Sequence, residues 1–379
     1  MKIAFVDVTV TVSYGGIQTA VWELARALHD DGHQVDVFGG EGAIQPELGG
    51  RGIGVKMFPF LDRGKVLDLG SRFRRIVERW TFARRAKQAV IDGEYDWVVL
   101  TKPFDFFWPR LMPKGHPTRF AFMSGGTDFF RGDRILARGI DAWVACSHFN
   151  AWQIQHYYKN FPEVMFNGVD VARFSPQALV AEGDERETLR HAWGLTDADV
   201  LFAFAGRLVG WKGLSVAVEA LASPLLVQLP TKLLIVGAGS DLPRLQEKAT
   251  RLGVTQRVIF HEPVSHQRLP ALYRAADVGI FPSIGDEAFG ITVAEAMACG
   301  LPVVASYIGG IPEVVGNEGS CGFLVSPGKP AHLAQVMTQL AQDHPLRDRL
   351  GRAARERIVS HFTWRDAARR LLAALPGQD

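Results

Sequence analysis

Two glutamates eight positions apart, Glu287 and Glu295, are the residues of this chain whose spacing points most clearly to chemistry. Glu287 lies in a glycine-flanked segment, and Glu295 lies in an apolar run that predicts a helix ending at Gly300, before Pro302. At about 1.5 Å of rise per helical residue, the spacing predicts carboxylates roughly 10 Å apart. That separation suits two hydroxyl-bearing groups of one elongated ligand better than a shared metal ion or proton.

The segment between the two glutamates predicts a helix N-terminus over residues 289–292, whose free backbone N–H groups would stabilise an anion or a polar sugar face. Solvated surface charge is the alternative interpretation of both glutamates, since most carboxylates are exposed. Residues 291–298 offer no clear exposed stripe around Glu295, however, and burial of a carboxylate without a partner is costly. The sequence therefore favours a bound partner for Glu295.

Two cations, Arg207 and Lys212, border a glycine-rich turn that follows a predicted strand at 201–205 and leads into a predicted helix. These groups suit a diphosphate, because a guanidinium offers a bidentate fork and an ammonium a point charge. Two surface cations on a loop are the alternative. The turn is not a P-loop, because Trp211 stands where the second glycine should precede the lysine. ATP hydrolysis is therefore disfavoured.

Other catalytic patterns are weak in this sequence. The Gly-Ala-Gly at 237–239 lacks the third glycine of a dinucleotide fingerprint, which disfavours a nicotinamide cofactor. The Asp-Ala-Asp at 197–199 precedes a predicted strand instead of following one, so it is more typical of solvated charge than of a metal-dependent sugar transferase. There is no nucleophile elbow, and the histidines have no metal-ligand spacing. We expect neither a metal nor an organic cofactor.

Length and composition favour a two-domain cytoplasmic protein. The 379 residues exceed a comfortable single core, and a net charge of +2 argues against nucleic acid as a partner. Three cysteines without disulfide or metal spacing are typical of reduced thiols. No run approaches the ~20 apolar residues that span a bilayer, and Asp7 interrupts any signal-peptide core. We expect a soluble protein or one attached peripherally to the inner face of the plasma membrane.

Short apolar runs alternate with helical patterns along the chain, which is typical of parallel sheets covered by helices. One series begins with strand, helix and strand over residues 3–38, with Gly15 and Gly16 before the helix. A second series begins with the strand at 201–205, after a polar stretch at about 172–198. Ligands of doubly wound sheets bind at the carboxyl ends of strands, so two facing sheets would hold a ligand in the cleft between them.

Taken together, the motifs resemble those of the family 4 retaining glycosyltransferases of the GT-B fold, in the family's order and over nearly the whole chain. The matching segments are Gly15-Gly16-Ile17, residues 167–170, the Gly206-Arg207 turn with Lys212-Gly213, and Glu287-x7-Glu295 with the surrounding 289–303. The resemblance implies an α/β fold with two Rossmann-like doubly wound domains facing across a donor cleft. It assigns acceptor binding to residues 1–171, nucleotide-sugar binding to 172–358, and a helix crossing back to the N-terminal domain to 359–379.

The resemblance also implies roles for single residues. Arg207 and Lys212 would clamp the donor diphosphate and stabilise the leaving group, which with Glu287 makes them the expected catalytic residues. Glu287 would hold hydroxyls of the transferred sugar, and Glu295 those of the ribose. Further donor contacts would come from Gly15, Gly16, Val264, Phe289, Gly290 and Ile291.

One departure from the family concerns the segment after the fourth strand of the N-terminal domain, where many relatives carry a histidine. This chain has Met123 to Asp128 there, with no histidine. Asp128 could contact the sugar or cap a turn, and both interpretations stay open.

The activity implied by the resemblance is metal-independent, retaining transfer of a hexose from a nucleotide diphosphate sugar to a glycan or glycolipid acceptor. We expect a UDP-linked donor in preference to a GDP-linked one, and a role in bacterial lipopolysaccharide or other cell-envelope polysaccharide synthesis. Two alternatives stay open. One is a hydrolysing nucleotide-sugar epimerase on the same fold, and the other is a non-catalytic subunit that binds sugar nucleotides.

A basic stretch at residues 72–87 carries seven cations and one acid. On a helix, Phe73, Ile76, Val77, Trp80 and Ala83 would form an apolar stripe flanked by arginines. One interpretation packs this stripe on the N-terminal sheet. The other is an anionic membrane surface or phosphorylated glycolipid as partner, since basic amphipathic segments with aromatic residues bind such surfaces. The cations concerned are Arg72, Arg74, Arg75, Arg79, Arg84, Arg85 and Lys87.

Overall fold

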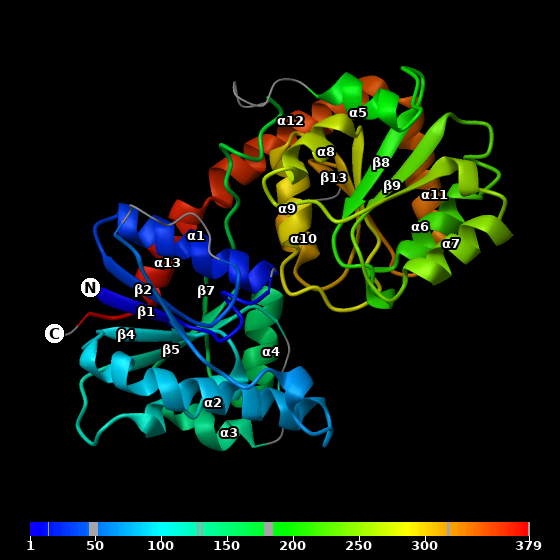
Figure 1. The fold of residues 1–379 in the computed structure, drawn as a ribbon. Helices are drawn as coiled ribbons and strands as arrows, with labels where there is room; N and C mark the ends of the chain where they lie inside the picture. The colour runs from blue at the N-terminus through cyan, green and yellow to red at the C-terminus, as the bar shows by residue number, and fades with distance from the viewer. Residues whose placement is uncertain are drawn as a thin grey trace. The chain divides into compact units, whose positions relative to one another are not determined.

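The computed structural model describes residues 1–13, 15–44, 52–126, 129, 132–177, 185–316 and 319–377. The chain forms two compact units: Met1–Gly168 with Trp364–Asp379 is the first, and Val169–Thr363 is the second. Each unit contains one parallel sheet covered by helices (Figure 1). The predicted α/β fold with two doubly wound sheets is therefore confirmed.

The first unit is built on a seven-stranded sheet with the strand order β3-β2-β1-β4-β5-β6-β7. Its strands are Lys2–Val6 (β1), Gln34–Gly40 (β2), Gly54–Phe58 (β3), Trp97–Leu100 (β4), Arg119–Ser124 (β5), Ala142–Ala145 (β6) and Glu163–Val164 (β7). Its α-helices are Gly16–Asp30 (α1), Ser71–Asp92 (α2), Asp133–Leu136 (α3), His148–Tyr158 (α4) and Trp364–Ala374 (α13). Strands covered on both faces need apolar residues at successive positions, which explains the apolar runs in the sequence.

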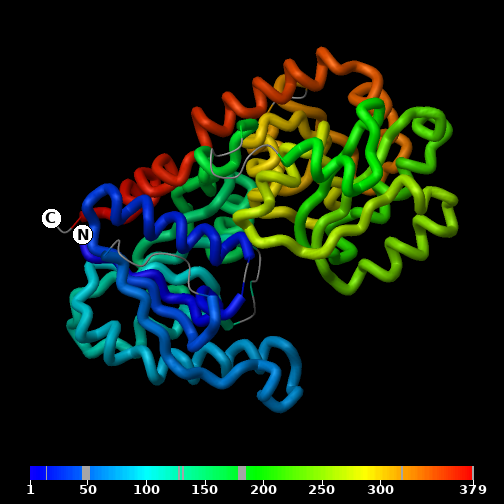
Figure 2. The backbone as a smooth tube through the Cα atoms, turned by 45° about the horizontal axis from the view of Figure 1, so that its top comes forward, coloured from blue at the N-terminus to red at the C-terminus, as the bar shows by residue number. Residues whose placement is uncertain are grey.

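The last helix, α13, completes the core of the first unit. Its buried residues Ala367 and Leu371 belong to the same hydrophobic cluster as Leu24 and Ala25 of α1. Figures 1 and 2 both show α13, in red, beside α1, in blue. Residues more than three hundred positions apart in the sequence thus cover one face of the first sheet.

The second unit is built on a six-stranded sheet with the strand order β10-β9-β8-β11-β12-β13. Its strands are Val200–Ala205 (β8), Thr231–Val236 (β9), Val258–His261 (β10), Val278–Phe281 (β11), Val303–Ser306 (β12) and Gly322–Val325 (β13). Its α-helices are Arg186–Ala192 (α5), Leu214–Leu221 (α6), Leu242–Arg251 (α7), Leu269–Ala275 (α8), Ile291–Ala298 (α9), Ile311–Val315 (α10), Pro330–Gln342 (α11) and His344–His361 (α12). The strand order places β8 and β11 side by side, where the order reverses direction.

Of the two interpretations of residues 72–87, the structure does not support the one that packs the apolar stripe of α2 on the sheet. Phe73, Ile76 and Trp80 are each at least 40% exposed, so they do not pack as a stripe on the sheet. Arg79, which the sequence places among the surface cations, is only 4% exposed, so its assignment to a membrane-facing surface is wrong. The buried residues of α2 are Glu78, Arg79, Phe82, Ala83, Ala86 and Val90.

Arg79 is buried because two buried carboxylates, Asp7 and Asp105, require a cation. Its Nη2 lies 3.2 Å from Asp7 Oδ1, and its Nη1 donates to Asp105. Burial alone would raise the pKa of Asp7, but the charge of Arg79 and hydrogen bonds from Thr101 and Thr9 outweigh burial and hold this pKa below its usual value. Burial raises the pKa of Asp105 to about 7, because one guanidinium does not offset two buried negative charges.

The raised pKa of Asp105 predicts a pH dependence of stability. Between its ordinary pKa of 3.8 and the folded value of about 7, the folded state binds more protons than the unfolded state. The free energy of unfolding should therefore fall as pH rises through this window, by at most about 1.4 kcal/mol per pH unit from this group. Asp105→Asn keeps the shape of the side chain and removes its titration. Urea unfolding at pH 5 and pH 8 should show a larger loss for the wild type than for this variant.

The control for this measurement is Asp31→Asn, which changes an exposed aspartate of the same unit. It should keep the pH dependence of the wild type. Equal losses of stability in the wild type and Asp105→Asn between pH 5 and pH 8 would contradict the prediction.

Candidate functional site

The residues predicted for the site in the second unit follow the carboxyl ends of three strands. Arg207 comes two residues after β8, Val264 three residues after β10, and Glu287 six residues after β11. Parallel strands end at the same edge of their sheet, so the loops that carry these residues emerge from one edge. The loops that carry Arg207, Val264 and Glu287 thus follow the carboxyl ends of their strands, where doubly wound sheets bind ligands.

Lys212 and Glu287 form an ion pair, with 2.6 Å between Nζ and Oε2. Lys212 is 9% exposed and buries its ammonium group beside this carboxylate. The turn after it requires Gly213, whose φ is 69° and where a Cβ would come to 1.9 Å from the carbonyl oxygen of Pro282. On the other side, the carbonyl of Glu287 accepts a hydrogen bond from Gly310 N at 2.8 Å. Backbone contacts therefore fix both partners of the pair.

Arg207 and Lys212 both lie against the ring of Trp211. The distance from the ring centroid is 5.9 Å to Arg207 Cζ and 4.5 Å to Lys212 Nζ, within the range of cation–π contacts. The Trp211 carbonyl accepts hydrogen bonds from Ile284 N at 2.8 Å and Gly285 N at 3.1 Å. The turn that carries the two cations is thereby tied to the segment that leads to Glu287. Because Arg207 is exposed, its guanidinium can reach a ligand without leaving a buried partner.

Glu295 is buried, at 4% exposure, and its partner is His266. The distance from Oε1 to Nε2 is 2.7 Å, and the other ring nitrogen, Nδ1, lies 3.3 Å from Nη1 of Arg173. Because an arginine can only donate, Nδ1 accepts and the ring proton lies on Nε2, which donates to Glu295. The ring also packs against Phe174, with 5.1 Å between centroids.

His266 is the residue of this site that the sequence did not reveal. The expected need of Glu295 for a partner was right, but the structure supplies that partner within the chain, so burial of Glu295 does not by itself imply a ligand. No spacing marks His266 among the 11 histidines. The only available signal was the cost of burying Glu295, and this cost does not say which donor compensates it.

The N-terminus of α9 lies between the two glutamates, as predicted. Gly290 caps it in the left-handed conformation, with φ 97° and ψ 55°, and neither a capping side chain nor an acidic residue in the first turn offsets its free N–H groups. Phe289 contributes only backbone, because its side chain is 3% exposed and packs against Phe362 with 5.8 Å between ring centroids. The backbone of Gly290 and Ile291 thus offers N–H groups to an anion or a hydroxyl oxygen.

Gly15 and Gly16 belong to the first unit, at the start of α1. Gly15 is the N-cap residue, and α1 has neither a capping side chain nor an acidic residue in its first turn. The segment after β1 is held by Asp7, which accepts from Thr9 N at 2.9 Å and Thr9 Oγ1 at 2.8 Å, while Gln18 donates to Thr9 Oγ1 at 2.8 Å. The buried Arg79 network therefore also fixes the chain that leads to these glycines.

Two further expectations concern Asp128 and a metal. Asp128 lies outside the described residues. Within the described ranges, the structure places no three His, Cys, Asp or Glu side chains together in a way that could hold a metal ion.

Family models match the chain over two adjacent regions. Residues 14–173 match Glycosyltransferase Family 4, and residues 185–357 match Glycosyl transferases group 1. The first match takes in most of the first unit, and the second takes in most of the second unit.

Curated relatives that carry the name D-inositol 3-phosphate glycosyltransferase match part of the chain. The protein from Xylanimonas cellulosilytica is 36% identical over 250 residues, covering 64% of this chain and 58% of the relative. The protein from Salinispora arenicola is 39% identical over 248 residues, covering 62% and 54% respectively. The matched part of the chain thus spans little more than half the length of these relatives.

Solved structures match over nearly the whole chain. HepE of Anabaena, in complex with UDP and glucose, has a TM-score of 0.79 at 22% identity and covers 99% of both chains. Sucrose-phosphate synthase of Thermosynechococcus elongatus has a TM-score of 0.81 at 22% identity and covers 98% of this chain and 99% of its own. WaaG, a glycosyltransferase involved in lipopolysaccharide biosynthesis, has a TM-score of 0.74 at 18% identity and covers 99% and 100%. Fold and family matches agree, and the chain belongs to the family 4, group 1 glycosyltransferases of the GT-B type.

Proposed function

We propose that this protein transfers a hexose from a nucleotide diphosphate sugar, with UDP favoured as the nucleotide, to a glycan or glycolipid acceptor. The observation that carries the proposal is the Lys212–Glu287 ion pair beside the exposed Arg207, where β8 and β11 end. This arrangement offers two positive charges to a diphosphate and a carboxylate to sugar hydroxyls at one place. The UDP and glucose bound by HepE, and the names of the curated relatives, support the same class of reaction.

The reaction depends on charge that moves to the diphosphate in the transition state. In the retaining mechanism that we propose, the acceptor hydroxyl attacks the anomeric carbon from the side of the departing diphosphate. The bond from that carbon to the phosphate oxygen breaks, and the hydroxyl proton passes to this oxygen. Arg207 and Lys212 stabilise the negative charge that develops there, so no metal ion is required for that purpose. Glu287 accepts hydrogen bonds from hydroxyls of the transferred sugar.

Glu295, oriented by His266, is the proposed binding contact for the ribose of the nucleotide. His266 Nε2–H holds one carboxylate oxygen at 2.7 Å and leaves the other free to accept ribose hydroxyls. Val264 lies in the same loop as His266 and contacts the base, while the backbone of Phe289, Gly290 and Ile291 contacts the sugar. Gly15 and Gly16 approach the phosphates with their N–H groups. In this proposal most donor contacts come from the second unit, and the first unit contributes Gly15 and Gly16 and binds the acceptor.

We also propose that the acceptor lies at an anionic membrane surface, as expected in the synthesis of lipopolysaccharide or another cell-envelope polysaccharide. Exposed apolar side chains gather between residues 61 and 80: Leu61, Leu67, Leu69, Phe73, Ile76 and Trp80. Arg72, Arg84, Arg85 and Lys87 are exposed on the same helix, whereas Arg74 pairs with Asp68 and Arg75 lies over the Phe104 ring. No helix in the described part of the chain has the length and apolarity needed to cross a bilayer. The proposed attachment is therefore peripheral.

The first prediction concerns affinity for the donor. Glu295→Ala removes the proposed ribose contact, and His266→Ala removes the group that orients it, so each should weaken UDP-sugar binding by about 1–3 kcal/mol. Isothermal titration calorimetry with UDP-glucose measures this directly. Glu247→Ala, at an exposed position of α7, is the matched control and should bind like the wild type. Unchanged affinity of Glu295→Ala would remove Glu295 from the donor site.

The second prediction concerns turnover. Arg207→Ala and Lys212→Ala should each lower kcat at saturating donor by about a hundredfold or more, because their charges act mainly in the transition state. Transfer of labelled sugar from a panel of UDP- and GDP-sugars to glycan and lipid acceptors measures this, with and without EDTA. EDTA should leave activity unchanged, and Arg251→Ala, at an exposed position, serves as the control.

Three outcomes of this assay would contradict the proposal. Conversion of the nucleotide sugar without an acceptor would indicate a hydrolysing epimerase. Donor binding without any turnover of the isolated chain would indicate a non-catalytic subunit. Loss of activity in EDTA that manganese or magnesium restores would replace the cationic clamp with a metal site.

The third prediction concerns membrane attachment. Each basic residue near an anionic surface contributes about 1 kcal/mol, so serine at Arg72, Arg84, Arg85 and Lys87 should release the protein from anionic liposomes. Sedimentation with liposomes should decrease as salt rises, because salt screens this attraction. The matched control changes four exposed arginines of the second unit, Arg244, Arg251, Arg349 and Arg352, to serine. Equal sedimentation of the two quadruple variants would contradict a membrane-binding role of α2.

A further inference from the structure

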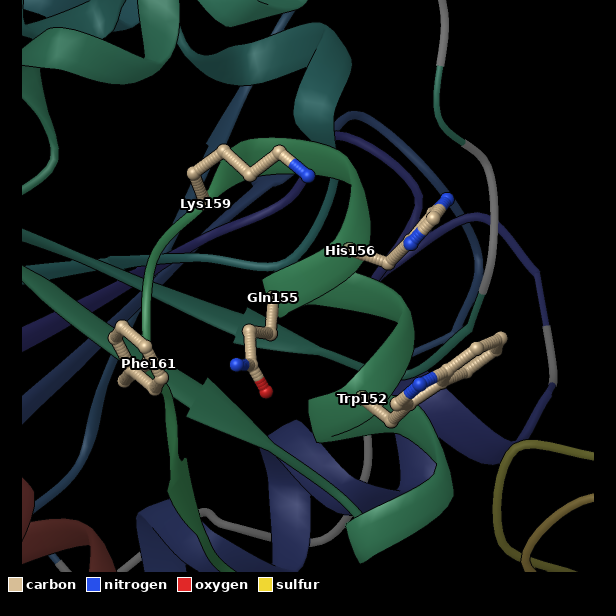
Figure 3. A pocket seen from close by; sticks show the side chains of 5 residues that line it. All are labelled: Trp152, Gln155, His156, Lys159 and Phe161. Carbon is tan, nitrogen blue, oxygen red and sulfur yellow. The ribbon is translucent and has the colours of Figure 1, made fainter.

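A pocket of about 330 Å³ lies on the C-terminal half of α4 and the residues that follow it (Figure 3). Its lining comes wholly from the first unit, and no residue assigned above to the donor lies in it. The volume falls at the lower end of the range of small-molecule sites, which begins at about 300 Å³ and suits a ligand of one or two rings. The lining residues are Trp152, Gln155, His156, Lys159 and Phe161.

The apolar part of the pocket consists of aromatic rings that do not serve the core. Trp152 is 59% exposed and Phe161 is 80% exposed. The Trp152 ring stacks with His156 at 5.6 Å between centroids and with Phe149 at 6.3 Å, so the three rings form a row along one face of α4. The core contacts of this helix are made instead by its buried residue Ile154. Exposed aromatic rings such as Trp152 and Phe161 can bind a ligand with an apolar face.

The polar part of the pocket consists of the side chains of Gln155, His156 and Lys159. In Figure 3, the amide of Gln155 lies between the rings of Trp152 and Phe161. Over the described ranges of the chain, the side chains of Gln155, His156 and Lys159 have neither a hydrogen bond nor an ion pair. One amide, one imidazole and one ammonium group are thus available to a ligand. Together they can donate and accept hydrogen bonds and attract an anion.

The backbone supports a role for the ammonium group of Lys159. Lys159 is the C-cap residue of α4 and has the left-handed φ of 65°, a conformation in which glycine or asparagine is usual. Its N–H donates to the Gln155 carbonyl at 3.0 Å, which ends the helix and turns the chain toward Phe161. A lysine therefore stands where the backbone favours other residues, as happens where a side chain has a function.

We propose that this pocket is a subsite for a sugar ring that carries an anionic group, on the acceptor glycan. One face of a pyranose consists of C–H groups that pack on the exposed parts of the Trp152 and Phe161 rings, and its hydroxyls meet the donors and acceptors of the Gln155 amide. The anionic substituent meets Lys159, with His156 beside it. A purely apolar ligand would leave these polar groups unmatched, and a single lysine offers too little charge for a nucleic acid.

The assignment to the acceptor rests on the proposed function, but binding of the sugar does not. Two sources of the negative charge share this chemistry, a uronic acid carboxylate and a sugar phosphate. The probes are therefore a glucuronic-acid disaccharide, glucose 6-phosphate and the neutral disaccharide maltose. Saturation-transfer NMR and titration of the full chain with each probe measure contact and affinity.

We expect the wild type to bind at least one anionic probe at least tenfold more tightly than maltose, and the tighter of the two identifies the charged group. Trp152→Ala should lower affinity for all probes that bind by at least tenfold. Lys159→Asn, which suits the left-handed backbone, should reduce the affinity for the anionic probe to that for maltose and leave maltose binding unchanged. The matched control is Tyr307→Ala, which removes another exposed ring, 66% exposed, from the second unit.

The donor site must be separated from this pocket, because a sugar phosphate could bind to its cations. Binding of the anionic probe should persist in Lys212→Ala, and UDP-sugar affinity should be unchanged in Trp152→Ala. Equal affinities for neutral and anionic probes, or binding that survives Trp152→Ala, would overturn the subsite. Anionic-sugar binding in a chain that transfers no sugar would refute the proposed function alone, whereas transfer without such binding would refute the subsite alone.

Discussion

Buried charge must be paired, and this constraint decides where the polar side chains of both units lie. In the first unit, Arg79 of α2 pairs with Asp7 and Asp105, which follow β1 and β4 in the sequence. In the second unit, Glu295 is held by His266. A lone ion at any of these places would cost several kcal/mol. The pairs therefore hold loops as well as charges, since each of them joins segments that are distant in sequence.

The Lys212–Glu287 pair shows how such a constraint can serve chemistry. The two groups lie 2.6 Å apart, so the largely buried Lys212 has a partner of opposite charge within the chain. A bound anion could pair with Lys212, and ligand hydroxyls could donate hydrogen bonds to Glu287. These two interactions would replace the Lys212–Glu287 ion pair. The ion pair thus compensates the two charges and holds both side chains in a fixed orientation toward a ligand.

The sequence predicted the central strands well because helices cover both faces of each sheet and these strands are apolar throughout, whereas β3, with Lys56, and the two-residue β7 lack such a run. It also singled out Glu287 and Lys212 as candidate residues, but it could not show their contact across 75 positions, which depends on the sheet order that brings β8 beside β11. The sequence left the direction of the apolar stripe of α2 open, because periodicity alone allows Ile76 and Trp80 to face the core and does not reveal that Asp7 and Asp105 need the guanidinium of Arg79. His266 could not be found, since the identity of a donor to Glu295 is decided only by how the loop after β10 folds.

The position of α13 affects how the protein can be made. The first unit begins with the first residues of the chain, yet its core contains Ala367, Leu371 and Leu375 from the end. During synthesis, the whole second unit leaves the ribosome before these residues are available. The apolar face of α1 that they cover therefore stays exposed to solvent until translation ends. The segment Val169–Thr363 is continuous in the sequence and can fold before that. The half of the protein that is translated first is thus the half that is finished last.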